Sequence, residues 1–405
     1  MRTLLIIGGG AEQVPAYELA RERGLRIVGT DANMDAPALK LAHHKILSST
    51  RDSEQTVKKV KDFSFSHKID GVMTIANDVP LTVAKVAEEL GLTSIGSASA
   101  KLFSNKLLMK EAFNRFNVPC PWFSSVKSAT ELEKLVITHK AQKYVLKPVD
   151  GRGARGVIIL DDKTDLGWAF EESSKYGESK EMILEEFVEG YQFSTESFLL
   201  DGVCYTPAIS ERNYSRFDQF WPNMIEDGGT IPANLSSVIR DKINSLILNG
   251  AAALGVRYGL VKGDIVLDCE GNPKIIELAA RLSGGWFASH QIPSATGVNL
   301  VDAVITYALG GSVTKDKLLP KIDKGNAMRF WFPRPGKIKK IYGESDLKKI
   351  PGLVKYGFYK KLGDIQPKIK MHSDRFGYVI CEGKNRVEAE RRVEKAISCV
   401  RIETE

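Results

Sequence analysis

The first ninety or so residues alternate short apolar runs with amphipathic stretches of helical spacing. The expected strands are Thr3–Ile7, Arg26–Gly29 and Gly71–Ile75, and the expected helices are Pro15–Arg23 and Pro80–Leu90. That alternation is typical of a parallel, doubly wound sheet with helices on both faces. Ligands of such sheets bind beyond the carboxyl ends of the strands. Gly8-Gly9-Gly10 and Asn77-Asp78 follow two of these strands, so we expect both near a ligand.

A dinucleotide site is one interpretation of the glycine turn. Gly8–Gly10 follows a strand, and Asp31 lies about twenty residues further on, as in a dinucleotide-binding fingerprint. The pattern is incomplete, because Gln13 occupies the last glycine position. A tight strand-to-helix turn is the simpler interpretation of these glycines.

The charge of the chain is uneven and bears on its partners. The 405 residues include 57 Lys and Arg and 50 Asp and Glu, a formal charge of +7, but residues 1–314 carry −4 and residues 315–405 carry +11. The basic segment lacks the aromatic residues interleaved with basic ones that mark a nucleic-acid stacking platform, so we expect a solvated surface and no nucleic-acid partner. No stretch approaches the ~20 apolar residues that span a bilayer, so we expect no membrane partner. Five cysteines without CxxC spacing indicate reduced thiols and a cytoplasmic protein.

A glycine-rich loop is the first candidate site. It joins the expected strands Tyr144–Lys147 and Val157–Leu160, and it contains Gly151, Gly153 and Gly156 with two arginines. Glycines let backbone N–H groups close on a phosphate, and Lys147 could meet the same anion. No Gly-Lys-Ser/Thr follows, so this is not a Walker motif; a flexible basic hairpin tip is the alternative.

A second hairpin, over residues 260–278, is the stronger candidate. Side chains alternate along a strand, so Glu277, Ala279 and Arg281 share one face. A two-residue turn at Glu270-Gly271 would place Asp264 opposite Glu277, and a turn at Gly271-Asn272 would place it opposite Ala279. Neighbouring carboxylates repel unless a cation lies between them, and Mg²⁺ shared with nucleotide phosphates suits such oxygens. A three-residue loop would shift this register, and two solvated carboxylates are the alternative.

The segment after Arg281 could receive a substrate. Ser283, Gly284 and Gly285 are small enough to let a substrate approach the backbone, and Trp286 either walls a pocket or packs in the core. No cluster has zinc-ligand spacing, and we interpret His290 as structural.

Five ordered motifs together resemble the ATP-grasp superfamily over nearly the whole chain. They are Asn105-Lys106, Val145–Pro148 with Gly151–Gly156, Ile183–Gly190 with Phe193–Ser197, Lys262–Asp264, and Ile276–Gly285. The resemblance implies a multidomain α/β and α+β chain with the ATP-grasp fold. Its expected parts are a doubly wound, Rossmann-like pre-ATP-grasp domain (1–98), an ATP-grasp core (99–314, with a lid subdomain at about 122–190) and a closing domain (315–405). Pro335–Lys337 and Asp374–Val379 are similar to the closing domains of biotin-carboxylase-like and L-amino-acid-ligase-like members.

The resemblance also implies roles for single residues. Lys106 and Lys147 would hold ATP phosphates under a lid containing Gly151, Gly153 and Gly156. Glu185 would accept from the adenine amino group, Glu186, Phe187 and Val188 would offer backbone contacts, and Gln192 would bind a ribose hydroxyl. Asp264 and Glu277 would bind Mg²⁺, which Mn²⁺ could replace, and Arg281 would be catalytic by steadying the transferred phosphoryl group and the acyl phosphate. Substrates would lie near Asn77, Asp78, Ser283, Gly284, Gly285 and Trp286.

One departure from the family pattern concerns the metal. Ala279 stands where the family often has Asn, two positions after the second metal carboxylate, so one Mg²⁺ would lose a ligand or take water instead.

The implied function is an ATP-dependent ligase that joins a small-molecule carboxylate to an amine through an acyl phosphate and releases ADP and phosphate. One alternative is a bicarbonate-activating carboxylase or an enzyme similar to carbamoyl-phosphate synthase. A nucleotide-binding protein without catalysis is another, motivated by Ala279. Dimers are common among similar enzymes, so a homodimer is one expected assembly.

Overall fold

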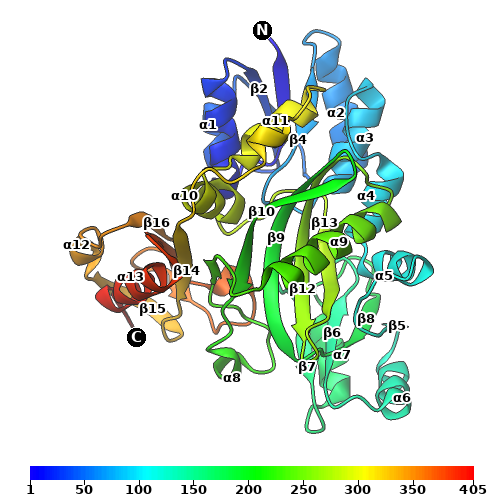
Figure 1. Cartoon of the computed structure of the whole chain (residues 1–405), viewed down its shortest axis with the longest axis vertical. Helices are drawn as coiled ribbons and strands as arrows, with labels where there is room; N and C mark the ends of the chain where they lie inside the picture. Colours follow the sequence, from blue (N-terminus) through cyan, green and yellow to red (C-terminus); the bar gives the residue numbers. More distant parts are fainter.

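A four-stranded parallel sheet, in the order β3-β2-β1-β4, organises the N-terminal part of the computed structural model, which describes all 405 residues (Figure 1). Its strands are β1 (Thr3–Ile7), β2 (Arg26–Asp31), β3 (His44–Leu47) and β4 (Gly71–Met73). Leu5 packs with α2 (Ser53–Ser64) and α3 (Pro80–Leu90) on one face, and Leu4 packs with α1 (Val14–Glu22) on the other. Because helices cover both faces, the apolar strands are buried throughout. The predicted doubly wound parallel sheet is confirmed.

A helix from much later in the chain completes the cover of this sheet. α11 (Leu300–Ala308) packs against β4 and α1, and its Ile305 belongs to the same apolar cluster as Leu4. A Cβ on Gly71 would lie 2.6 Å from the carbonyl oxygen of Ala308. Glycine is therefore required at the start of β4 for this close approach.

An eight-stranded antiparallel sheet forms the centre of the molecule, in the order β13-β12-β9-β10-β11-β14-β18-β16. Its strands are β9 (Gly190–Leu200), β10 (Val203–Arg212), β11 (Gly229–Ile231), β12 (Gly259–Asp268), β13 (Pro273–Ala279), β14 (Gly325–Trp331), β16 (Leu353–Phe358) and β18 (Gly377–Gly383). On one face, Phe113 of α5 (Lys106–Arg115) and Ile247 of α9 (Ser237–Ala253) pack with Ile265 and Leu278. The strand alternation leaves the opposite side chains of β12 and β13 free to face a cavity.

A smaller antiparallel sheet, β5-β8-β6-β7, lies at the bottom of Figure 1 and is called the lid below, after the prediction from the sequence. It contains β5 (Phe123–Val126), β6 (Tyr144–Pro148), β7 (Ile158–Leu160) and β8 (Met182–Glu186), with α6 (Ala129–His139) and α7 (Leu166–Ser174) packed on it. The glycine-rich loop joins the antiparallel pair β6 and β7, as predicted.

The C-terminal part extends the central sheet. β14, β16 and β18 pack against α13 (Arg386–Cys399), beside a three-stranded sheet in the order β17-β15-β19. The remaining elements are β15 (Gly336–Tyr342), β17 (Ile365–Gln366), β19 (Arg401–Thr404), α4 (Ser97–Ser104), α8 (Phe217–Phe220), α10 (Ile292–Thr296), α12 (Glu344–Leu347), and the short helical turns η1 (Ala11–Gln13), η2 (Pro37–Leu41), η3 (Phe287–Gln291), η4 (Lys315–Lys317) and η5 (His372–Asp374). None of the helices combines the length and the apolar character needed to cross a membrane.

The β12–β13 hairpin differs from its predicted turn, yet it keeps the predicted pair. Asp268 donates to the carbonyl of Asn272 across a three-residue loop, which Gly271 closes at φ +78°. That loop pairs Ile265 with Ile275, one residue off the register of a two-residue turn. A bulge then restores the register, so Asp264 lies opposite Glu277. The prediction of the turn was wrong and that of the pair was right, because Ile276 is inserted as one extra residue.

Candidate active site

One cavity of about 750 Å³ lies where the four parts of the molecule meet. Asp78 comes from the N-terminal part, Lys147 from the lid, Asp264 from the central sheet and Arg375 from the C-terminal part. Most of the predicted site residues line it: Asp78, Lys106, Lys147, Gly151, Gly153, Glu185, Glu186, Phe187, Val188, Gln192, Asp264, Glu277, Arg281, Ser283, Gly284 and Gly285. Residues as far apart in sequence as Asp78 and Gly285 thus line the same cavity.

Three predicted residues do not line this cavity. The indole of Trp286 is buried in an apolar cluster with Met328, Phe330 and Tyr378, so core packing describes it and a pocket wall does not. A Cβ on Gly156 would lie 2.8 Å from the carbonyl oxygen of Ser173, so this glycine allows the loop to pack against α7. Asn77 lies beside Gly8, beyond the carboxyl ends of β1 and β4.

The glycine turn after β1 is a structural turn. The N–H of Gly9 donates to Oδ2 of Asp31 at 2.9 Å, and a Cβ on Gly9 would lie 2.7 Å from Cγ of Leu39. Asp31 is thereby engaged in holding the turn rather than facing a ribose. This supports the simpler of the two interpretations made from the sequence.

The two lysines predicted to bind phosphate come from different elements: Lys106 from α5 and Lys147 from β6 of the lid. Asn105 caps α5 by accepting from the N–H of Leu108 at 3.0 Å, which places Lys106 in the first turn of that helix. The Lys106 ammonium donates to the carbonyl of Gly151 at 2.7 Å and lies 3.2 Å from Oε1 of Glu277. It therefore connects the glycine loop to the carboxylate hairpin.

Lys147, at the end of β6, lies 2.9 Å from Oε1 of Glu185. A second lysine, Lys110, is fully buried one helical turn after Lys106 and lies 3.6 Å from the same oxygen. Burial alone would raise the pKa of Glu185, but the ammonium groups of Lys110 and Lys147 hold it below its ordinary value. Sequence reasoning missed Lys110, although its i, i+4 spacing from Lys106 places both on one helix face.

The hinge, residues 186–188 at the end of β8, contains a backbone N–H without a hydrogen-bond partner. The N–H of Glu186 donates to the carbonyl of Trp122 at 2.9 Å, and the N–H of Phe187 donates to that of Lys143 at 3.0 Å. The N–H of Val188 has no partner in the protein. Nearby, Gln192 accepts from the hydroxyl of Tyr214 at 3.1 Å. An edge-on heterocycle could therefore use the Val188 N–H.

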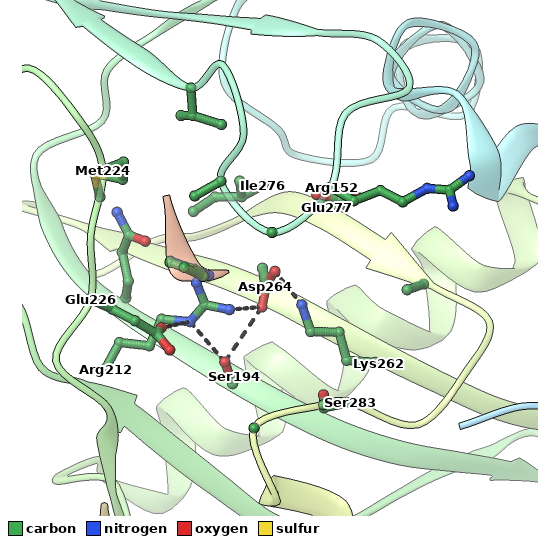
Figure 2. Close-up of a pocket in the computed structure, with 18 of the residues that line it drawn as sticks. Arg152, Ser194, Arg212, Met224, Glu226, Lys262, Asp264, Ile276, Glu277 and Ser283 are labelled. Atoms are coloured by element: carbon green, nitrogen blue, oxygen red, sulfur yellow. Dashed lines mark hydrogen bonds and ion pairs between the residues drawn. The ribbon is translucent and has the colours of Figure 1, made fainter. Parts of the chain in front are cut away.

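Asp264 lies at the centre of a charged cluster on β9, β10 and β12 (Figure 2). Its two oxygens contact the guanidinium of Arg212 and the ammonium of Lys262, and Ser194 is bonded to Arg212 at 2.7 Å. Although burial would raise the pKa of Asp264, the two cations hold it well below its usual range. Arg212 was missed from the sequence because its strand, β10, contains Pro207, which argues against a central strand.

The carboxylate pair fits a hard cation. Asp264 and Glu277 are directly opposite in the ladder, and both line the cavity. No group of three or more His, Cys, Asp or Glu side chains is arranged so that it could hold a metal ion by itself. Two carboxylates suit Mg²⁺, which takes its other ligands from phosphates and water, better than they suit zinc.

Arg281 is oriented by a residue 203 positions away. Ala76 donates to the carbonyl of Leu282 at 2.9 Å, which ties the loop after β4 to the segment after β13. Nε of Arg281 then donates to Asp78 at 2.6 Å. The neighbouring charges lower the pKa of Asp78 and raise that of Arg281, both against the effect of burial. Two residues predicted to act on the substrate therefore form one partly buried ion pair.

Two carboxylates, one half-buried and one fully buried, hold the small-residue segment after Arg281. Glu12 accepts from the N–H of Gly285 at 2.8 Å, and Glu196 accepts from the N–H of Ser283 at 2.7 Å. A Cβ on Gly284 would lie 2.4 Å from Oε2 of Glu12, so a larger residue there would displace that carboxylate. Sequence reasoning missed both acids: Glu12 lies outside the motifs, and Glu196, although it lies within Phe193–Ser197, acts through a partner distant in sequence.

Family models match the ATP-grasp N-terminal domain over residues 17–93, the ATP-grasp domain over residues 103–285 and the L-amino acid ligase C-terminal domain 2 over residues 329–405. The phosphoribosylamine–glycine ligase of Methanocaldococcus jannaschii is 25% identical over 314 residues, which cover 69% of this chain and 67% of that protein. Carnosine synthase 1 of Homo sapiens is 24% identical over 337 residues, which cover 76% of this chain and 40% of that protein.

Among solved structures, the L-amino acid ligase of Bacillus licheniformis shares the fold with a TM-score of 0.84 at 22% identity, covering 100% of this chain and 99% of that one. The three family models occur in the order in which the domains were predicted, and together they span most of the chain. The chain therefore belongs to the ATP-grasp superfamily, and it is an ATP-grasp enzyme of the carbon–nitrogen-bond-forming type.

Proposed function

We propose that this protein joins a small carboxylic acid to an amine, using ATP and an acyl-phosphate intermediate. The observation that carries the proposal is the convergence of Lys106, Lys147, Asp264, Glu277 and Arg281 on one cavity. These groups supply cations for phosphates and oxygens for Mg²⁺, without a nucleophile and base pair. That is the equipment of a reaction that depends on positioning and charge neutralisation.

The nucleotide binds between the lid and the central sheet. The Val188 N–H faces the adenine edge, Gln192 a ribose hydroxyl, and Lys106 and Lys147 the phosphates. Ile276, which the bulge turns toward the cavity beside Glu277, offers apolar surface to the base. Asp264 and Glu277 would hold Mg²⁺, which neutralises phosphate charge when it is bound.

The chemistry proceeds in two steps. A carboxylate oxygen of the first substrate attacks the γ-phosphorus, the bond from that phosphorus to the bridging oxygen breaks, and ADP leaves. The amine then attacks the acyl carbon, phosphate leaves with the former carboxylate oxygen, and the nitrogen loses a proton. Arg281, fixed by Asp78, stabilises negative charge on the transferred group in both steps. The substrates lie beyond Arg281, between Gly284 and Arg375.

The names of the similar proteins support this class of substrate. L-amino acid ligase is named for its amino-acid substrates, and the C-terminal family model, which matches residues 329–405, carries the same name. We therefore propose amino acids as the first pairs of carboxylate and amine to test.

The experiment is a phosphate-release screen with Mg-ATP and paired carboxylates and amines. We expect ADP and phosphate only when both partners are present. Asp264→Asn and Glu277→Gln should lose turnover, whereas Glu270→Gln, in the exposed turn of the same hairpin, should keep it. AMP and pyrophosphate as products, or entry of labelled bicarbonate into the product, would contradict the proposal. ATP binding without turnover across the screen would instead indicate a nucleotide-binding protein.

A further inference from the structure

The strand register places a lysine at the carboxylate pair. In the β12–β13 ladder, Lys262 is directly opposite Ala279, and the next cavity-facing pair is Asp264 and Glu277. These four positions form one cross-strand square whose side chains share a face. Lys262 and Ala279 are therefore parts of the same local site as the two carboxylates.

The ammonium group of Lys262 contacts the carboxylate pair through Asp264 alone. Its ammonium bonds to Asp264 and to no other side chain, and Figure 2 shows it reaching along its strand toward that carboxylate. Its cross-strand neighbour on β9 is Glu196, whose carboxylate is bonded to the N–H of Ser283 instead. Because the side chain of Ala279 is small, it leaves room for the lysine side chain on this face of the hairpin. Asparagine at position 279 would bring an oxygen donor there; alanine brings none.

The carboxylates already face more positive than negative charge. Asp264 contacts Arg212 and Lys262, and Glu277 lies 3.2 Å from Lys106. Arg212 divides its charge between Asp264 and Glu226, from which its Nε lies 3.3 Å. Lys262, in contrast, forms an ion pair with Asp264 alone. One divalent cation can use both carboxylates, but a second would lack a donor at position 279 and would meet the ammonium of Lys262.

Phosphoryl transfer from ATP can be served by two Mg²⁺ ions that bridge the β- and γ-phosphates, as in protein kinases. We propose that in this protein the ammonium of Lys262 takes the place of one of two divalent cations, so that the nucleotide complex contains a single metal ion held by Asp264 and Glu277. The inference rests on the proposed function, because it assumes that Mg-ATP binds at this hairpin. Lys262 then acts as a positioning group that supplies one fixed positive charge.

The test counts bound metal rather than activity. Free Mn²⁺ is measured by electron paramagnetic resonance during titration of the protein with a non-hydrolysable ATP analogue, and nucleotide binding is measured separately by calorimetry. We expect one bound Mn²⁺ per bound nucleotide in the wild type. The double variant Lys262→Met with Ala279→Asn removes the ammonium and restores an oxygen donor, so it should bind two.

Two further variants serve as controls. Lys262→Arg keeps the charge and should keep one ion. Lys274→Met removes an ammonium from the same hairpin, where it pairs with Asp268 outside the cavity, and it should also keep one ion. Thermal unfolding of each variant confirms that it is folded.

The outcomes separate the two proposals. Two Mn²⁺ ions in the wild type, or one in the double variant with nucleotide binding retained, would overturn the role of Lys262 and leave the ligase proposal standing. Absence of nucleotide binding in the wild type would overturn the proposed function and this inference together.

Discussion

Asp78 shows how a single residue distant in sequence can set the position of a catalytic group. Its carboxylate is the hydrogen-bond acceptor of Arg281 and has a lowered pKa, so it is ionised at neutral pH. Asp78→Asn keeps the shape but removes the charge that orients the guanidinium. We expect kcat to fall at least tenfold, about 1.4 kcal/mol of transition-state stabilisation, while KM for ATP changes less than threefold. Steady-state ADP release measures both, with the exposed Asp62→Asn as control; an unchanged kcat would contradict the role of the pair.

Glu196, in the same region, is expected to make the folding stability depend on pH. Burial raises the pKa of Glu196 from 4.5 to about 7, against the bond from the Ser283 N–H. Between these two values the folded chain binds more protons than the unfolded chain, so this residue makes stability fall as the pH rises through that window. Glu196→Gln removes the titration and can still accept the Ser283 N–H.

The variant should therefore gain stability over the wild type more at pH 8 than at pH 5, by an amount on the order of 3 kcal/mol at most. Thermal unfolding of both proteins at the two pH values measures the difference. An equal difference at both values would show that Glu196 does not titrate in this range.

Two glycines of the lid loop allow the stability cost of backbone strain to be measured separately from the cost of a steric clash. Gly153 and Gly156 both have positive φ, +59° and +68°. A Cβ on Gly153 meets nothing within 4 Å, whereas one on Gly156 would lie 2.8 Å from the carbonyl of Ser173. Gly153→Ala should therefore cost only the backbone strain, about 1 kcal/mol, and Gly156→Ala should cost clearly more.

The unfolding free energy from urea titration measures these two costs, and the ATP concentration at half-maximal rate reports on the loop. Because Gly153 lines the cavity and Gly156 does not, Gly153→Ala should affect ATP use more than its small cost in stability suggests. Equal stability costs for the two variants would show that the contact with Ser173 is easily relieved.

Elements with strong local signals were predictable, and those set by long-range pairing were not. The helix Pro80–Leu90 was predicted with the bounds observed for α3, because apolar spacing and helix-ending residues are local signals. β10 was missed because Pro207 lies at an irregularity in its pairing with β9. The carboxylate pair was placed correctly although the loop was not, because the bulge at Ile276 compensates for a three-residue loop.

The same distinction applies to the candidate site. The motifs identified Lys106, Lys147, Asp264, Glu277 and Arg281, which all line the cavity. Arg212, Glu12 and Glu196 were missed, because their partners lie far away in the sequence and one sequence contains no record of such contacts. The sequence did not decide whether Trp286 lines a pocket or packs in the core. A single aromatic residue forms no repeating pattern that would show which side of an element is buried.

At the scale of the whole molecule, the basic C-terminal segment contributes little charge to the site. Arg375 is the only Lys or Arg of residues 315–405 that lines the cavity. The segment instead contacts the lid: the N–H of His372 donates to the carbonyl of Gly153 at 3.2 Å, and Lys370 lies 3.3 Å from Glu172 of α7. The C-terminal part therefore contacts the lid at two places, the glycine-rich loop and α7.

This arrangement predicts that the Lys370–Glu172 pair favours the closed lid. Lys370→Glu would place two carboxylates at the contact, and the expected result is a two- to fivefold higher KM for ATP, since a partly exposed pair contributes about 0.5–1 kcal/mol. The charge swap Lys370→Glu with Glu172→Lys should restore KM, because attraction returns with the signs reversed. Lys368→Glu is the matched control, because Lys368 has the same exposure and no acidic partner. KM values for the three variants and the wild type at low and high salt measure the effect, which salt should weaken. An unchanged KM in Lys370→Glu, or no recovery in the charge swap, would show that the lid closes without help from the C-terminal part.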